Sequence, residues 1–271
     1  MDDILFALFL TFIAGISTVI GALVVFFAKK SNTKFLAVSL GFSAGVMIYI
    51  SLVEILSKAK DMLSAEVGNK DGTLLATIGF FAGILIIALI DKFMPRATDP
   101  HDSKDITDFA PNTKIQNSES RAKLLRTGLF TALAVTIHNF PEGLMTFIAA
   151  LQDLNVALPI LIAIIIHNVP EGIAVAAPIY FSTGSKLKAF LITALSGLSE
   201  PVGAIIGYMI LLPFLSDIVF GMIFAAVAGI MIYISFDELL PSAREYGDHH
   251  LSIYGLISGM AVMAVSLWLL L

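Results

Sequence analysis

The residues best suited to chemistry form two copies of one short motif. Residues 138–143 have the sequence HNFPEG, and residues 167–172 have the sequence HNVPEG. Each copy brings an imidazole, a carboxamide and a carboxylate close together, and Glu200 adds a further carboxylate. Nitrogen and oxygen donors of these kinds bind zinc and other divalent transition metals. The doubled motif therefore predicts a metal site with these ligands: His138, Asn139, Glu142, His167, Asn168, Glu171 and Glu200.

Helical geometry divides these side chains between two edges. Successive residues of an α-helix are about 100° apart, so Glu142 lies angularly between His138 and Asn139, at about 40°. Two such helices facing each other offer two His and two Glu on one edge, which suits zinc. The other edge offers two Asn, the same two Glu and Glu200, an oxygen-rich set better matched to iron(II) or manganese. Shared carboxylates could bridge two ions about 3.5–4 Å apart.

The elements that must position this site are membrane-spanning helices. Of 271 residues, 58% are hydrophobic and 14% are charged, with a mean hydropathy of +0.92. Soluble chains are nearer about 45–50% apolar and about 25% charged. The apolar segments are long enough to cross about 30 Å of hydrocarbon as helices. We predict a single all-α transmembrane domain over residues 1–271, with eight spans near 4–28, 35–57, 73–94, 123–150, 157–181, 186–212, 215–240 and 252–271.

The predicted site residues fall near the middle of the bilayer. A charged side chain there costs at least about 2.5–3.5 kcal/mol, so it should face the protein interior with a partner. Glu142, Glu171 and Glu200 repel one another, and no Lys or Arg lies at that depth to neutralise them. The neutralising cation must be a proton or a metal ion.

Other unusual residues have a structural or a functional interpretation. Pro141, Pro170 and Pro201 should each weaken a helical hydrogen bond four residues earlier. Glu54 and the pair Asp237 and Glu238 lie near helix ends, where acidic side chains are usually solvated. If they function in transport, Glu54 would lie at the outer entrance and the pair at the cytoplasmic exit.

An internal repeat predicts how the helices are arranged. Residues 44–56 (AGVMIYISLVEIL) resemble residues 228–240 (AGIMIYISFDELL), and the two HNxPEG motifs form a second pair. Each pair is separated by an odd number of spans, so its members run in opposite directions. The simplest arrangement is a 3+2+3 inverted-repeat bundle: residues 1–94, a central metal-binding pair over 123–181, and residues 186–271. Secondary transporters commonly place their substrate at such a repeat interface.

Basic residues predict the orientation, because cytoplasmic connections are rich in Lys and Arg. Thirteen basic residues lie on the side of connections one, three, five and seven, and three lie on the other side. This asymmetry predicts a cytoplasmic loop over residues 95–122 and places both termini outside the cytoplasm.

Composition also excludes several classes of function. A net charge of −5 gives no reason to expect a nucleic-acid partner, and the absence of cysteine excludes disulfides and thiolate metal sites. The His-Glu-x-x-His arrangement of zinc proteases is missing, so we expect no enzyme activity and no resident cofactor.

The doubled HNxPEG motif, together with residues 199–203 (SEPVG), resembles the ZIP metal transporters, in particular the bacterial ZupT-type proteins. The resemblance covers the whole chain. It implies uptake of zinc and, less selectively, of iron(II), manganese, cobalt or cadmium across a bacterial cytoplasmic membrane by alternating access. It implies a binuclear centre, with a zinc-type site at His138, Glu142, His167 and Glu171. The adjoining site would be Asn139, Glu142, Asn168, Glu171 and Glu200.

Several alternatives stay open at the level of sequence. A metal-selective channel could use the same oxygen-rich site, and the motifs do not encode direction, so an exporter is a further alternative. The partners predicted are divalent metal ions and the lipid bilayer. The oligomeric state is open, with a homodimer as one option.

Overall fold

The computed structural model describes residues 2–27, 32–93, 118–152, 154–211, 216–246 and 249–269. These residues are almost entirely helical, and no strand occurs among them. Most of the predicted loop 95–122, from residue 95 to 117, lies outside the described residues, and residues 118–122 belong to a helix.

Each of the eight predicted spans corresponds to a long helix, and several of these helices are divided locally into shorter elements. In chain order these elements are α1 (Asp2–Phe26), α2 (Thr33–Ile50), η1 (Ser51–Ile55), α3 (Leu56–Val67), α4 (Asn69–Phe93), α5 (Ser118–Gln152), α6 (Leu154–Thr183), α7 (Lys186–Gly197), α8 (Ser199–Ile206), η3 (Gly207–Leu211), α9 (Asp217–Ile234), η5 (Ser235–Leu239), α10 (Leu240–Tyr246) and α11 (His249–Leu269). The second span is longer than predicted, because helix continues through α3 to Val67.

Seven of these long helices are both long and apolar enough to cross a membrane. The remaining one, α5, has 35 residues and so ample length, about 52 Å at 1.5 Å per residue. Its polar motif lowers its hydropathy, because His138, Asn139 and Glu142 lie in the middle of the segment. The helix least apolar by composition is therefore the one that carries the first copy of the motif.

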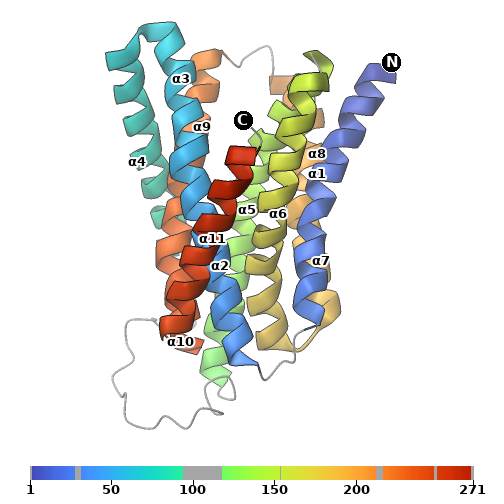
Figure 1. Cartoon of the computed structure of the whole chain (residues 1–271), viewed down its shortest axis with the longest axis vertical. Helices are drawn as coiled ribbons and strands as arrows, with labels where there is room; N and C mark the ends of the chain where they lie inside the picture. The colour runs from blue at the N-terminus through green and yellow to red at the C-terminus, as the bar shows by residue number, and fades with distance from the viewer. Residues whose placement is uncertain are drawn as a thin grey trace.

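Successive long helices run up and down through one bundle (Figure 1). In that view α1 begins, and α11 ends, toward the upper end, while α10 and the start of α5 lie toward the lower end. Helices α5 and α6 run through the middle, with α2, α3, α4, α9 and α11 on one side and α1 and α7 on the other. The compartment that each end faces stays a prediction.

Five helix pairs make the most extensive contacts in the bundle, and one of them is α5 packed on α6. Helix α2 packs on α11 and α4 packs on α9, while α1 packs on α6 and α5 packs on α8. The α5–α8 contact depends on glycine: a Cβ at Gly143 would lie 2.0 Å from the Glu200 carbonyl oxygen, and one at Gly203 would lie 2.0 Å from that of Phe140. Small residues allow such close approach in membranes, and this one brings Glu200 beside α5.

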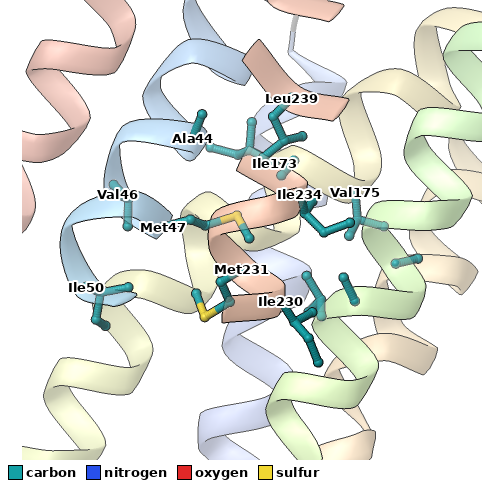
Figure 2. Close-up of a cluster of buried hydrophobic side chains, with 14 of the residues drawn as sticks. Ala44, Val46, Met47, Ile50, Ile173, Val175, Ile230, Met231, Ile234 and Leu239 are labelled. Atoms are coloured by element: carbon teal, nitrogen blue, oxygen red, sulfur yellow. The ribbon is translucent and has the colours of Figure 1, made fainter. Parts of the chain in front are cut away.

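The core joins the two similar segments of the internal repeat to the second motif helix. Figure 2 shows the labelled side chains of α2, α6 and α9 gathered in one hydrophobic cluster. Met47 and Met231, which occupy matching positions in residues 44–56 and 228–240, are both almost fully buried there. Close packing in this hydrophobic cluster restricts the position of α6 relative to α2 and α9.

The same two segments each contain one turn of π-helix that the sequence analysis did not predict. These turns are η1 and η5, and each begins at a buried serine. The Ser51 hydroxyl donates to the Met47 carbonyl at 2.5 Å, and the Ser235 hydroxyl donates to the Met231 carbonyl at 2.8 Å. Serine bonds of this kind back to the preceding turn bend helices, and single π-turns are frequent at functional sites.

The prolines have unequal effects on the helices. Helix α5 continues without interruption through Pro141, and α6 continues through Pro170. Near Pro201 the helix is broken, because α7 ends at Gly197, Leu198 forms a turn and α8 begins at Ser199. The weak point at Gly197, expected four residues before Pro201, is therefore present.

Candidate metal centre

The centre is built mainly on α5 and α6, which lie side by side along the middle of the bundle. His138 and Glu142 are one turn apart on α5, and His167 and Glu171 are one turn apart on α6. The i, i+4 spacing places both members of each pair on one helix face. Because α5 packs against α6, the two faces meet and four potential ligands converge.

Contacts within the centre are short and cross between the helices. His167 Nε2 lies 3.0 Å from Glu142 Oε1, and His138 Nε2 lies 3.3 Å from Glu142 Oε2. His138 Nε2 is also 3.6 Å from Glu171 Oε1. Two ligands bound tetrahedrally to one zinc ion, each about 2.1 Å from it, are separated by about 3.4 Å. The spacing of these donor atoms therefore suits a single ion bound among them.

One ligand atom from each of His138, Glu142 and His167 lies within 4.8 Å of the others. The imidazoles and Glu171 are buried, whereas Glu142 keeps 13% of its side chain exposed. Glu142 contacts both imidazoles, so its carboxylate lies between α5 and α6.

Glu200, on α8, is connected to the same region by a hydrogen bond with the Asn168 amide. Asn168 Nδ2 donates to Glu200 Oε1 at 2.5 Å and also to the carbonyl oxygen of Ala14 in α1 at 2.9 Å. With its NH₂ group held by these two acceptors, the Asn168 amide has a fixed orientation. Its Oδ1 atom accepts no hydrogen bond from the described residues.

Although both imidazoles lie in short contact with the Glu142 carboxylate, many polar atoms of the centre form no hydrogen bond of good geometry within the described part of the chain. They include both ring nitrogens of His138 and His167, both amide atoms of Asn139, and one or both carboxylate oxygens of Glu142, Glu171 and Glu200. Buried polar atoms are normally satisfied, and exceptions need an explanation. Such a set of unsatisfied nitrogen and oxygen donors fits a bound divalent cation.

Asn139 is the predicted site residue that the structure connects least. It is fully buried on α5 beside His138, but its side chain forms no hydrogen bond with any described residue. His138, Glu142, His167 and Glu171 form one group through direct contacts, and Asn168 and Glu200 form a second.

The sequence analysis missed two contacts that support the centre. The carbonyl of Ala14 brings α1 to the Asn168 amide, and the Ser43 hydroxyl of α2 donates to the carbonyl of Pro170, the residue before Glu171, at 2.7 Å. Neither α1 nor α2 carries a metal-ligand motif. A partner that uses only a backbone carbonyl leaves no signal in the sequence.

Comparison with known proteins shows which family the chain belongs to. The family model described as ZIP Zinc transporter matches residues 95–267. The chain belongs to the ZIP zinc transporter family. It is 55% identical over 277 residues to the zinc transporter ZupT of Clostridium perfringens, with 99% of this chain and 97% of the relative covered. It is 56% identical over 270 residues to ZupT of Streptococcus mutans, with 99% of each chain covered.

ZupT of Oceanobacillus iheyensis aligns with the whole chain at 54% identity over 271 residues, with 100% of both chains covered. The resemblance inferred from the doubled motif is therefore confirmed along the full length. Membership in this ZIP family and seven apolar helices of sufficient length make the chain a multi-pass membrane protein.

Proposed function

We propose that this protein carries zinc into the cytoplasm of a bacterium through the centre formed by His138, Glu142, His167 and Glu171. The observation that carries the proposal is the convergence of two imidazoles and two carboxylates at mid-helix, with donor atoms 3.0–3.6 Å apart. Imidazole and carboxylate together are normal zinc ligands. The three relatives described above, each from a different bacterial species, carry the name zinc transporter, which supports zinc as the substrate.

Charge balance further supports a cation as the substrate. Three glutamates and two histidines meet here, and no lysine or arginine pairs with these glutamates among the described residues. Even with both histidines protonated, the group would keep a net negative charge. Desolvated carboxylates without a counter-ion are costly, and a passing dication removes that cost.

A second ion position would adjoin the first. Its ligands would be Asn139, Glu142, Asn168, Glu171 and Glu200, and the carboxylates of Glu142 and Glu171 would be shared between the two ions. The fixed Asn168 amide supports this arrangement, because its free Oδ1 and the neighbouring Glu200 carboxylate supply hard oxygen donors. Such a hard, oxygen-rich position suits iron(II) or manganese. Cobalt and cadmium would be carried less selectively than zinc.

Transport would proceed by alternating access in a 3+2+3 inverted-repeat bundle. The pattern of helix pairs supports the repeat. In an inverted repeat, α1, α2, α4 and α5 correspond to α8, α9, α11 and α6. The contact of α2 with α11 then corresponds to that of α9 with α4, and the contact of α1 with α6 corresponds to that of α8 with α5. The matching π-turns at Ser51 and Ser235 follow the same correspondence. In such folds one bundle rocks against the other around the bound substrate.

Zinc uptake into proteoliposomes, followed with radioactive zinc, tests the proposal. Glu142→Ala and Glu171→Ala should each reduce uptake to the level of empty liposomes, because each removes a ligand that no neighbour replaces. Glu66→Ala, at an exposed position of α3, is the matched control and should transport normally. Near-normal uptake by the Glu142 and Glu171 variants, inserted at equal density, would contradict the proposal.

A further inference from the structure

A second cluster of buried charges lies outside the metal centre and joins four elements. Arg126 on α5 pairs with Asp91 on α4 through one guanidinium nitrogen, and with Glu238 on η5 through another at 3.0 Å. The side chains are 13%, 17% and 6% exposed, respectively. We call Arg126, Asp91 and Glu238 the arginine cluster. Arginine suits this role, since its planar fork can engage two carboxylates at once.

Hydroxyl groups complete the arginine cluster. The Thr127 hydroxyl donates to Glu238 Oε2 at 2.9 Å and lies 3.1 Å from the Ser242 hydroxyl of α10. Both Glu238 oxygens are thus engaged, one by Arg126 and one by Thr127. The arrangement fixes the lower part of α5 to α4, η5 and α10 through charged and neutral hydrogen bonds.

In the described part of the other copy of the repeat, the matching acidic residue does not link two helices. Glu54 occupies in residues 44–56 the position that Glu238 occupies in residues 228–240. Its carboxylate is 2.5 Å from Lys58, one turn further along the same helical segment, and the pair is exposed by 33% and 49%. The segments are similar, but among the described residues Glu238 binds a metal-centre helix, whereas Glu54 contacts Lys58 in its own helical segment.

Arg126 is connected to the metal centre through α5 itself. Thr127 and Thr131 are one turn apart, and Thr131 and His138 are two turns apart, so all three lie on one face of the helix. Thr131 is fully buried. A movement of this end of α5 away from α4 and η5 would uncover the face that leads to His138.

We propose that the arginine cluster is an interhelical latch, which closes one end of the route to the metal centre and must open for the ion to pass. The inference rests on the alternating-access part of the proposed function. Its physical basis is that Arg126 is the shared partner of the buried Glu238 and the partly buried Asp91, so moving α5 breaks both pairs together. In the opposite half, Glu54 and Lys58 belong to one helical segment and impose no such constraint.

Cysteine labelling in nanodiscs tests the latch without any transport measurement. The chain contains no cysteine, so Thr131→Cys introduces a single buried reporter for a membrane-impermeant maleimide. With the latch intact, labelling should be slow. Adding Arg126→Gln should raise the labelling rate at least about tenfold, because removing one partner leaves two buried carboxylates unpaired. Asp91→Asn should give a smaller increase, since Arg126 keeps Glu238.

Two controls separate latch opening from other effects. Lys58→Gln breaks the pair within one helix and should leave the rate unchanged. Ala44→Cys on α2, also fully buried, reports general unfolding and should label slowly in every variant. An unchanged Thr131→Cys rate in both Arg126→Gln and Asp91→Asn would overturn the latch. An equal increase at Ala44→Cys would overturn it as well.

The labelling assay is performed without metal, so its result does not depend on whether zinc is the substrate. Failure of the latch would leave the Glu142 and Glu171 uptake experiment intact. Failure of zinc uptake would likewise leave the labelling result interpretable.

Discussion

The metal centre and the arginine cluster are both groups of buried carboxylates, and they differ in how their charge is balanced. At the arginine cluster, Glu238 has both oxygens engaged and shares Arg126 with Asp91. At the metal centre, both oxygens of the buried Glu171 lack hydrogen-bond partners among the described residues. The arginine cluster is paired and hydrogen-bonded within the protein, whereas the metal centre has unsatisfied donor atoms that we propose bind a cation.

This difference separates carboxylates that the chain itself pairs with arginine from carboxylates that we propose are paired with a metal ion. An ion pair whose two partners both belong to the chain can fix helices relative to one another, and loss of one partner from a buried pair is strongly destabilising. Buried donor atoms without hydrogen-bond partners lower the stability of the metal-free protein. Such atoms need an explanation, and a bound ligand supplies one. The two clusters should therefore respond in opposite ways to loss of a charged side chain.

Arg126→Gln should produce the largest loss of stability. Removing the shared cation should lower the free energy of unfolding by about 3–5 kcal/mol, the range for breaking a buried pair. The measurement is the apparent melting temperature in detergent without metal, compared with Lys58→Gln. That control should change stability by no more than about 1 kcal/mol, as expected for an exposed pair. Equal melting temperatures for the two variants would contradict the assignment of Arg126.

Glu171→Gln should change the metal-free stability less than Arg126→Gln does, and it should reduce the stabilisation that zinc provides. Without metal, the melting temperature should stay level or rise, because a buried charge without a cation is removed. With zinc at about 100 times its dissociation constant, the unchanged protein should gain about 2.7 kcal/mol, and the variant should gain far less. A metal-free loss as large as that of Arg126→Gln would remove the distinction between the clusters.

Much of the fold follows from the sequence because hydrophobic length determines membrane helices. The long helices appear where apolar segments were found, and the span predicted at 123–150 corresponds to α5, although the hydropathy of α5 is low. The break near Pro201 followed from the missing amide of proline. The π-turns were not predicted, because they depend on serine hydroxyl bonds whose sequence signal, one serine in an apolar segment, is common.

The centre was easier to predict than the arginine cluster for a physical reason. Each helix of the centre carries its ligands one turn apart, so local spacing shows the shared face. The partners of Arg126 are 35 and 112 residues away in the chain, and only tertiary packing brings them together. Glu238 illustrates the limit: its position near a helix end suggested a solvated side chain, but it is buried and bonded.

Anomalous diffraction at the zinc absorption edge, from crystals of protein saturated with zinc, tests the central claim most directly. The account predicts a peak among His138, Glu142, His167 and Glu171, with donor atoms about 2.0–2.2 Å from the metal. The same peak should be lost in Glu142→Ala. A centre without anomalous density, in protein that transports zinc under the same conditions, would contradict the account.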